Sequence, residues 1–207
     1  MNKEEKLGLL VKLKAKKGKE KKVKDFLISG LETVTNEQGT VSWFAYQEDA
    51  QTFGIYDTFT NEDGRNAHLN GEIAKYLIEN ADELLEDFNV TNSIKKTEIL
   101  ALDIKKGNQD IGLLVRLKAK KGKEKDVESF LDFAQKIVHN KEPKTVSWYA
   151  IKLDDGNYCI FDTSCDEEGR NTHLNGEVAA TLIEKVPEIF EGFDITDIKK
   201  IDILASK

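Results

Sequence analysis

Apolar and polar residues alternate along four short stretches of the first hundred residues, as they do in strands that have one face in a core. The predicted strands are residues 7–15, 41–47, 52–59 and 94–102. Between them, apolar residues recur at helical spacing and predict helices over residues 17–34, 60–79 and 81–88. The order strand, helix, strand, strand, helix, strand predicts a four-stranded antiparallel sheet with the helices on one face.

Three short sequences predict how these elements begin and end. Thr60 and Asp63 resemble a capping box that begins the helix after the third strand. Asn70 and Gly71 predict a stop or a kink in that helix, because both residue types tolerate the left-handed conformation. In the second half of the chain, the Asp-Gly pair at 155–156 predicts a hairpin turn, since both residues can adopt positive φ.

The chain contains the same unit twice. LLVKLKAKKGKEK returns as LLVRLKAKKGKEK, TVSW returns unchanged, and GRNAHLNGE returns as GRNTHLNGE, at positions 9–21 and 113–125, 40–43 and 145–148, 64–72 and 169–177. This period is far longer than that of solenoid repeats, so each copy should have its own core. We expect a first repeat at 1–102, a polar linker at 103–110 and a second repeat at 111–207.

The alternation places different side chains on the two faces of each sheet. Trp43, Ile55 and Asp57 share the face toward the helices with Val11. Large apolar side chains occupy the opposite face: Leu10, Phe44, Tyr46 and Tyr56 in the first copy, and Leu114, Tyr149, Ile151 and Phe161 in the second. Each would cost roughly 1.5 to 3 kcal/mol if it stayed in water. We therefore expect an α+β protein in which the two sheets pack as an eight-stranded, barrel-like core.

Composition narrows the class of protein. The 207 residues carry a formal net charge of −7, which disfavours binding to nucleic acid or to an anionic membrane. The lysine-rich stretch at 12–24 lacks aromatic residues and is typical of a solvated turn and helix start. Because no apolar stretch approaches the roughly 20 residues of a membrane span and no signal-peptide core is seen, we expect a cytoplasmic protein. Cys159 and Cys165 are not spaced as a metal or redox pair.

Two of the three histidines, His68 and His173, stand at matched places in the repeated nine-residue phrase. One interpretation is an imidazole at the margin of the core, hydrogen-bonded to backbone or to Asp57 and Asp162. The other is a base or donor in a pocket, because histidine exchanges a proton near neutral pH. We expect no metal, since one histidine and one carboxylate per copy fall short of three or four ligands.

Other candidate residues share this compartment. Asp57 and Asp162 lie on an otherwise apolar strand face and need a partner, for which Arg65 and Arg170 are natural candidates. The aspartates are either structural ion pairs or groups that orient a ligand. Trp43 and Trp148 either fill the core or form an aromatic pocket wall. Dinucleotide, nucleoside triphosphate, serine hydrolase and zinc protease motifs are missing from the sequence.

The sequence resembles the antibiotic biosynthesis monooxygenase family, also called quinol-monooxygenase-like proteins. The likeness rests on the element order, on KxGKExxVxxFL at the first helix, and on GTVSWFAY, FGIYDTF and AHLNG. It implies two tandem ferredoxin-like βαββαβ repeats that form an intramolecular dimeric α/β barrel. It also implies a ligand pocket in each copy between sheet and helices, where Trp43, Asp57 and His68 are expected. Some members oxidise quinols or polyketide phenols with O2 and no bound cofactor, whereas others cleave heme.

The chain departs from the family pattern at several positions. An E-x-W motif of the third strand is Asp57-x-Phe59 in the first copy and ends at Ser164 in the second, so the tryptophan is missing from both. The asparagine of heme-degrading members is replaced by Val11 and Val115, which disfavours heme cleavage. A second histidine often found beyond AHLNG is replaced by Ile73 and by Val178.

Two functions follow as hypotheses. In the first, the protein is a monooxygenase that needs no cofactor and acts on a small aromatic or quinol-type molecule. His68 and His173 would accept the substrate hydroxyl proton, Trp43 and Trp148 would form the pocket walls, and Asp57 with Arg65, matched by Asp162 with Arg170, would orient the substrate. In the second, it is a non-catalytic or stress-related module that holds a small hydrophobic ligand. Oxygen uptake with hydroquinones distinguishes the two.

Overall fold

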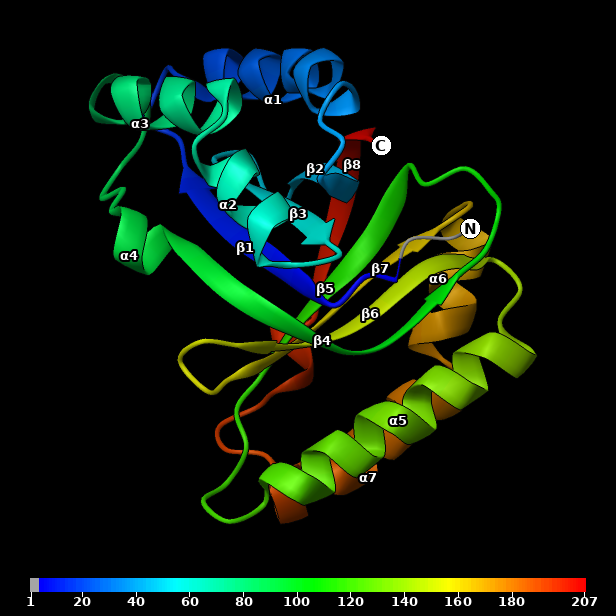
Figure 1. Ribbon diagram of the computed structural model, residues 1–207. Helices are drawn as coiled ribbons and strands as arrows, with labels where there is room; N and C mark the ends of the chain where they lie inside the picture. The colour runs from blue at the N-terminus through cyan, green and yellow to red at the C-terminus, as the bar shows by residue number, and fades with distance from the viewer. Residues whose placement is uncertain (1–3) are drawn as a thin grey trace. The chain divides into compact units, whose positions relative to one another are not determined.

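The computed structural model describes residues 4–207, which divide into two compact units (Figure 1). The first unit extends to Glu98 and also contains Asp202–Lys207, whereas the second unit is Ile99–Ile201. The last residues of the chain therefore belong to the unit that its first half forms.

The first unit has the predicted order of elements. These are β1 (Leu7–Lys14), α1 (Glu20–Thr35), β2 (Thr40–Gln47), β3 (Thr52–Phe59), α2 (Glu62–Leu69), α3 (Glu72–Leu84), α4 (Val90–Ser93) and β4 (Ile94–Ile104). The predicted strands and the first helix are confirmed. The expected separate helix at 81–88 is wrong, because its first residues instead extend α3 to Leu84. The short helix α4 was not predicted, because four residues are too few to show a periodic pattern.

The second unit repeats this order. Its elements are β5 (Ile111–Leu117), α5 (Glu124–Lys141), β6 (Thr145–Leu153), β7 (Tyr158–Ser164), α6 (Glu167–Leu174), α7 (Glu177–Ile189), a single 3₁₀ turn (Ile195–Asp197) and β8 (Lys199–Ser206). Strand β4 continues to Ile104, so the chain between β4 and β5 is residues 105–110. Among the helices within residues 4–207, none has both the length and the apolar composition needed to cross a bilayer.

The sheet has the antiparallel order that the element sequence predicts. In the first unit the strands follow one another as β4-β1-β3-β2-β8, and the first four form the ferredoxin-like arrangement. The place next to β2 is taken by residues 202–206 of β8. In the second unit the order is β8-β5-β7-β6-β4. Strands β4 and β8 each carry residues of both units.

The end of β8 is attached to the first unit by a side chain as well as by the sheet. The ammonium group of Lys207 donates hydrogen bonds to the backbone oxygens of Val34 and Glu37, at 2.9 and 2.7 Å. These carbonyls lie at and just after the C-terminus of α1, where backbone oxygens have no partner within the helix and a positive charge is favourable. Lys105 makes the matched contact with Val138 in the second unit.

The core of the first unit lies between its sheet and helices α1 and α3, which run side by side (Figure 1). Val11, Trp43 and Ile55 from the strands pack there with Val23 and Leu27 from α1. This confirms the predicted face toward the helices. The second unit repeats the arrangement with α5 and α7, and its core includes Val115, Trp148, Ile160, Val127 and Leu131.

The side chains predicted for the opposite sheet face belong to neither helix-side core and are buried: Leu10, Phe44, Tyr46, Tyr56, Leu114, Tyr149, Ile151 and Phe161. The ring centroids of Phe44 and Tyr56, which are partners across β2 and β3, are 6.4 Å apart. Removing such side chains from water stabilises the fold by roughly 1.5 to 3 kcal/mol each.

One cross-strand pair on this face differs between the copies in a compensating way. Tyr46 on β2 lies opposite Gly54 on β3, and a Cβ atom at Gly54 would be only 2.2 Å from the tyrosine ring. In the second copy Ile151 lies opposite Cys159. A large ring is thus matched with glycine in one copy, and a smaller side chain with cysteine in the other, which keeps the packed volume similar.

Helix ends differ in detail from the expectation. Asn61 rather than Thr60 caps α2, because its side-chain oxygen accepts a hydrogen bond from the Gly64 amide at 3.0 Å. The predicted break after Asn70 is confirmed, but Gly71 has an extended backbone as the residue before α3 and does not use the left-handed conformation. In the 155–156 turn, only the glycine has positive φ.

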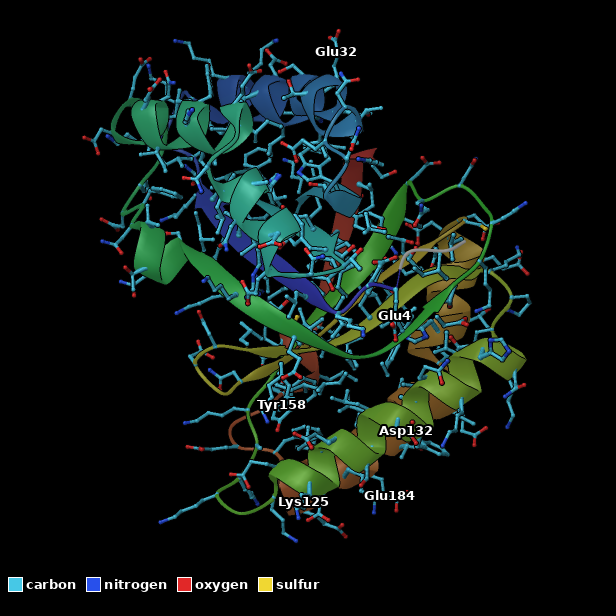
Figure 2. All side chains as sticks on the ribbon, in the orientation of Figure 1. Glu4, Glu32, Lys125, Asp132, Tyr158 and Glu184 are labelled. Carbon is cyan, nitrogen blue, oxygen red and sulfur yellow. The ribbon has the colours of Figure 1, made fainter. Side chains whose placement is uncertain are left out.

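The polar faces of the helices point away from the sheet. Figure 2 shows Glu32 on the outer side of α1, and Lys125 and Asp132 on the outer side of α5. Tyr158, at the start of β7, instead lies on the inner side of α5, where its hydroxyl donates a hydrogen bond to Glu128 at 3.2 Å (Figure 2). The helices are therefore amphipathic, with one apolar stripe toward the core.

Candidate functional site

His68 lies on the last turn of α2, where its imidazole contacts two carboxylates. Its Nδ1 atom is 2.6 Å from Oε2 of Glu37, and its Nε2 atom is 3.1 Å from Oδ2 of Asp57. The imidazole and Asp57 are buried, whereas 20% of the Glu37 side chain is exposed. The histidine therefore joins a carboxylate in the core to one near the surface.

Local structure explains how these groups meet. Asp57 lies on β3 with its side chain on the face toward the helices, and β3 leads directly into α2. The Asn61 cap fixes the first turn of α2, and α2 contacts β1, β2 and β3. This places His68 over the strands. Its position in the last turn also favours a charged imidazole, because the C-terminal end of a helix is electronegative.

Glu37 is a site residue that the sequence reasoning missed. It lies between α1 and β2, and the hydroxyl of Thr40 donates a hydrogen bond to the same Oε2 atom at 2.6 Å. A signal was present in the repeat, because a glutamate stands three residues before TVSW in both copies, at Glu37 and Glu142. The loop residues around it differ between the copies, and a comparison of apolar spacing therefore passed over it.

The second copy repeats the constellation. The Nδ1 atom of His173 pairs with Oε2 of Glu142, and its Nε2 atom is 3.6 Å from Oδ2 of Asp162. Thr145 donates a hydrogen bond to the same glutamate oxygen at 3.1 Å. Here the glutamate is more deeply buried, with 5% of its side chain exposed. The third histidine, His139, is exposed and contacts Asp103 outside this constellation.

Burial by itself would lower the pKa of His68. The negative charge of Asp57, with the contacts to both carboxylates, outweighs burial and raises the pKa to about 10. For Glu37 burial acts to raise the pKa, but the hydrogen bonds from His68 and Thr40 lower it below its usual value. Burial raises the pKa of Asp57 despite the nearby imidazole. At neutral pH the ring is therefore a cation between two acidic groups.

The second copy shows the same directions. Burial would lower the pKa of His173, but the charge of Asp162 and the hydrogen bond to Glu142 raise it. Burial raises the pKa of Asp162 to about 6. For Glu142, the hydrogen bond and the charge of His173 outweigh burial and lower the pKa. The electrostatic arrangement is thus a property of the repeated unit.

The expectation that Arg65 is the partner of Asp57 is wrong. Its Nη1 atom donates hydrogen bonds to the backbone oxygens of Gly8 and Thr97, at 3.3 and 3.2 Å, and its Nη2 atom pairs with Glu62. The side chain thus reaches the carbonyls of β1 and β4. The partner of Asp57 is His68, which lies one turn after Arg65 on α2.

Arg170 behaves in the same way. It donates a hydrogen bond to the backbone oxygen of Ile201 at 3.4 Å and pairs with Glu167. Its charge contributes only a small lowering to the pKa of Asp162. Both arginines thus join a helix to neighbouring strands. Their predicted part in orienting a ligand stays a prediction.

Trp43 and Trp148 are almost fully buried and belong to the helix-side cores. Within residues 4–207, no hydrogen-bond partner reaches the indole Nε1 atom of either one. An unpaired buried donor of this kind costs about 1 to 3 kcal/mol, and an oxygen atom of a ligand would satisfy it. Their role as pocket walls stays a prediction.

A recess of about 470 Å³ opens on the surface of the first unit beside Glu37 and His68. It lies between the end of α1, the start of β2 and helix α2, and its wall includes Asn36, Gly39, Ala67 and Glu72. Trp43 and Asp57 do not line it. A small molecule in this recess would therefore meet the glutamate and the Nδ1 side of the imidazole, while the aspartate holds the ring from behind.

The arrangement does not form a metal centre in the part of the chain from 4 to 207. Glu37 and Asp57 lie on opposite edges of the His68 ring, so the three side chains do not converge on one point. What the constellation can do is hold a positive charge close to an accessible carboxylate. Such a pair stabilises negative charge that develops on a bound molecule, and it offers an acceptor for a hydroxyl proton.

Comparison with known proteins places the fold. No family model matches the sequence, and no curated protein matches it. Solved structures do match. One is a putative monooxygenase of Fusobacterium nucleatum, with a TM-score of 0.83 and 15% identity over 98% of this chain and 94% of that chain.

Two further structures support the same conclusion. A putative monooxygenase of Lactobacillus acidophilus has a TM-score of 0.80 and 12% identity, over 98% of this chain and 96% of that chain. A protein described as anthrone oxidase-like has a TM-score of 0.69 and 10% identity, over 100% of this chain and 94% of that chain. The chain therefore has the fold of monooxygenase-like proteins, as the resemblance in its sequence implied.

Proposed function

We propose that the chain is a cofactor-independent monooxygenase that acts on a small aromatic or quinol-type molecule beside Glu37 and His68. One observation carries the proposal: an open recess leads to a charged histidine that is held between two carboxylates. The neighbours in fold that are described as putative monooxygenases or as anthrone oxidase-like support the class of reaction.

The two oxygens of Glu37 have different partners. Oε2 accepts hydrogen bonds from His68 and Thr40, whereas Oε1 accepts none from residues 4–207. In the proposed reaction a phenolic hydroxyl in the recess donates to Oε1, and the imidazolium stabilises the negative charge that forms on the substrate. The electron-rich substrate then reacts with O2. One oxygen atom replaces two hydrogens of the substrate, which leave as water with the other oxygen atom.

The proposal assigns the proton to the carboxylate rather than to the ring. The sequence had suggested His68 and His173 as proton acceptors. A ring with a pKa near 10 and with both nitrogens in contact with carboxylates acts at neutral pH as a donor and as a charge. The histidine is therefore given an electrostatic role, and the glutamate accepts the proton.

A second candidate function is ligand binding without chemistry. The observation that favours it is the same double contact of each imidazole, because a ring held on both sides is also a stable structural element. In that case the recess would hold a small hydrophobic molecule through its apolar wall and Glu37, and the molecule would leave unchanged.

Oxygen consumption tests the proposal. An oxygen electrode would record uptake with a panel of hydroquinones and anthrones for the wild type, for His68→Ala with His173→Ala, and for Glu37→Gln with Glu142→Gln. His139→Ala is the matched control, because this histidine is exposed and lies outside the constellation. We expect uptake in the wild type and in the control, and a large loss in both double variants.

Two results would count against the reaction. Uptake that is the same in the wild type and in both double variants would remove the assigned residues from the mechanism. If no compound of the panel produces uptake but one of them binds, as measured by calorimetry, the second candidate function is the correct one.

A further inference from the structure

We infer that only the first copy holds an open ligand site, and that two lysines close the matched position in the second copy. The inference rests on the proposed function, since it decides which of two similar constellations receives the small aromatic hydroxyl compound. The residues that flank the shared glutamate differ between the copies.

The two glutamates differ in their access to solvent. Glu37 exposes 20% of its side chain and forms part of the recess wall, whereas Glu142 exposes 5%. Their hydrogen bonds to histidine and threonine are the same. What differs is the set of residues around the glutamate: Asn36, Gln38 and Gly39 in the first copy, Lys141, Pro143 and Lys144 in the second.

Lys141 links the end of one helix to the start of another. It is the last residue of α5, and its ammonium group pairs with Glu177, the first residue of α7. In the first copy α1 ends at Thr35, and the Asn36 side chain donates a hydrogen bond back to Glu32, as Asn140 does to Lys136. The first copy thus has no lysine between this asparagine and the glutamate. Glu72, which matches Glu177, lines the recess and forms no ion pair with residues 4–207.

Lys144 makes the second link. Its ammonium group lies 3.0 Å from Oδ2 of Asp166 and also pairs with Glu168, so that it connects the start of β6 to the start of α6. At the matched position of the first copy, Gly39 has no side chain and approaches the backbone of Gly64. A Cβ atom at Gly39 would be 2.8 Å from the Gly64 Cα atom. The first copy therefore cannot place a lysine there without movement of the backbone.

Because of these contacts, the entrance to the space beside the glutamate differs between the two copies. In the first copy the space beside the glutamate is bounded by the small residues Gly39 and Ala67 and leads to the Oε1 acceptor of Glu37. A flat compound with a hydroxyl donor suits these walls, since the ring would lie on apolar surface and the hydroxyl would meet the carboxylate. In the second copy three ion pairs and the bulk of two lysine side chains stand at the equivalent entrance.

The three histidines allow a direct test by NMR. The chain is labelled with ¹⁵N-histidine, and the ring signals are followed during titration with hydroquinone. We expect the His68 signals to shift, because its ring shares Glu37 with the ligand, and the His173 signals to stay in place. His139 is an internal control for non-specific effects, since it is exposed and contacts Asp103 rather than either glutamate.

Substitutions at the flanking residues test whether the lysines close the site in the second copy. Asn36→Lys should form the missing ion pair with Glu72 and raise the hydroquinone concentration for half of the His68 shift by at least about tenfold. Lys141→Asn with Lys144→Ala should produce a new shift at His173. Equal shifts of both rings in the wild type would overturn the inference, as would no shift of either ring or no effect of the exchanges.

The outcomes separate this inference from the proposed function. A His68 shift without any oxygen uptake leaves the single open site in place and rejects the reaction. Uptake that is abolished by His173→Ala but not by His68→Ala would leave the reaction possible and reject the assignment to the first copy. Circular dichroism of each variant checks that the fold is retained.

Discussion

Raising the pH should remove the stability that the charged His68 ring gives to the fold. Its pKa rises from 6.5 to about 10 on folding, so between these values the folded chain holds a proton that the unfolded chain has released. This contribution is complete below pH 6.5 and is lost as the pH rises through 10. For one proton the free energy of unfolding falls by about 1.4 kcal/mol per pH unit, or roughly 5 kcal/mol across the window.

Urea unfolding at pH 7, 8 and 9 measures this slope. The variant His68→Gln keeps a polar side chain and removes the titrating group, so its free energy of unfolding should fall less steeply by about 1.4 kcal/mol per pH unit. His139→Gln should behave like the wild type, because the exposed ring is not held between two carboxylates. The raised pKa of His173 adds a loss of the same sign that remains in the variant.

NMR can measure the protonation state of the His68 ring directly. The ¹⁵N signals of His68 should report a protonated imidazole at pH 8, when an exposed histidine is neutral. A ring that titrates near 6.5, or equal slopes for the wild type and His68→Gln, would refute the reasoning that two carboxylates hold the proton.

Three further predictions concern neighbouring contacts. Glu37→Gln removes a charge-assisted hydrogen bond and should lower the pKa of His68 by roughly one to two units in an NMR titration, and an unchanged pKa would contradict the assigned contact. Arg65→Ala leaves two backbone oxygens without their donor and should lower the free energy of unfolding by about 1 to 3 kcal/mol. The same substitution should leave the pKa of His68 unchanged. A large change in that pKa would mean that Arg65 acts on Asp57. Gly54→Cys should destabilise the fold by about 1 to 3 kcal/mol through contact with Tyr46, and adding Tyr46→Ile should restore much of the loss. A double-mutant cycle without coupling would contradict this pairing.

Local pattern was enough to predict the strands and the first helix. Each strand has one face against helices, so alternation marks it, and α1 shows the helical spacing of Val23 and Leu27. The separate helix at 81–88 was wrong because helical spacing alone does not show where one helix ends and another begins. The pairing of residues 202–206 with β2 was not specified, since a strand's neighbour depends on contacts between residues far apart in sequence.

The candidate site was predicted in part for similar reasons. His68 and Asp57 were singled out because the repeat preserves them and because a carboxylate on an apolar face needs a partner. Residue spacing shows which side chains share a helix face, but it does not show how far a guanidinium reaches, and Arg65 was therefore given the wrong partner. Glu37 lies in a loop without periodicity, where only an exact match of the two copies reveals it.

The place of residues 202–207 in the first unit also determines when that unit can be completed during synthesis. Until they emerge, β2 is paired only with β3 and lacks β8, and the oxygens of Val34 and Glu37 lack the lysine that binds them. At about 5 to 20 residues per second, the intervening second copy takes roughly 5 to 20 seconds to translate. During that interval the nascent first half exposes an unpaired sheet edge, a kind of surface that can pair with other chains. Doubling the unit in one polypeptide thus makes translation speed part of the folding problem.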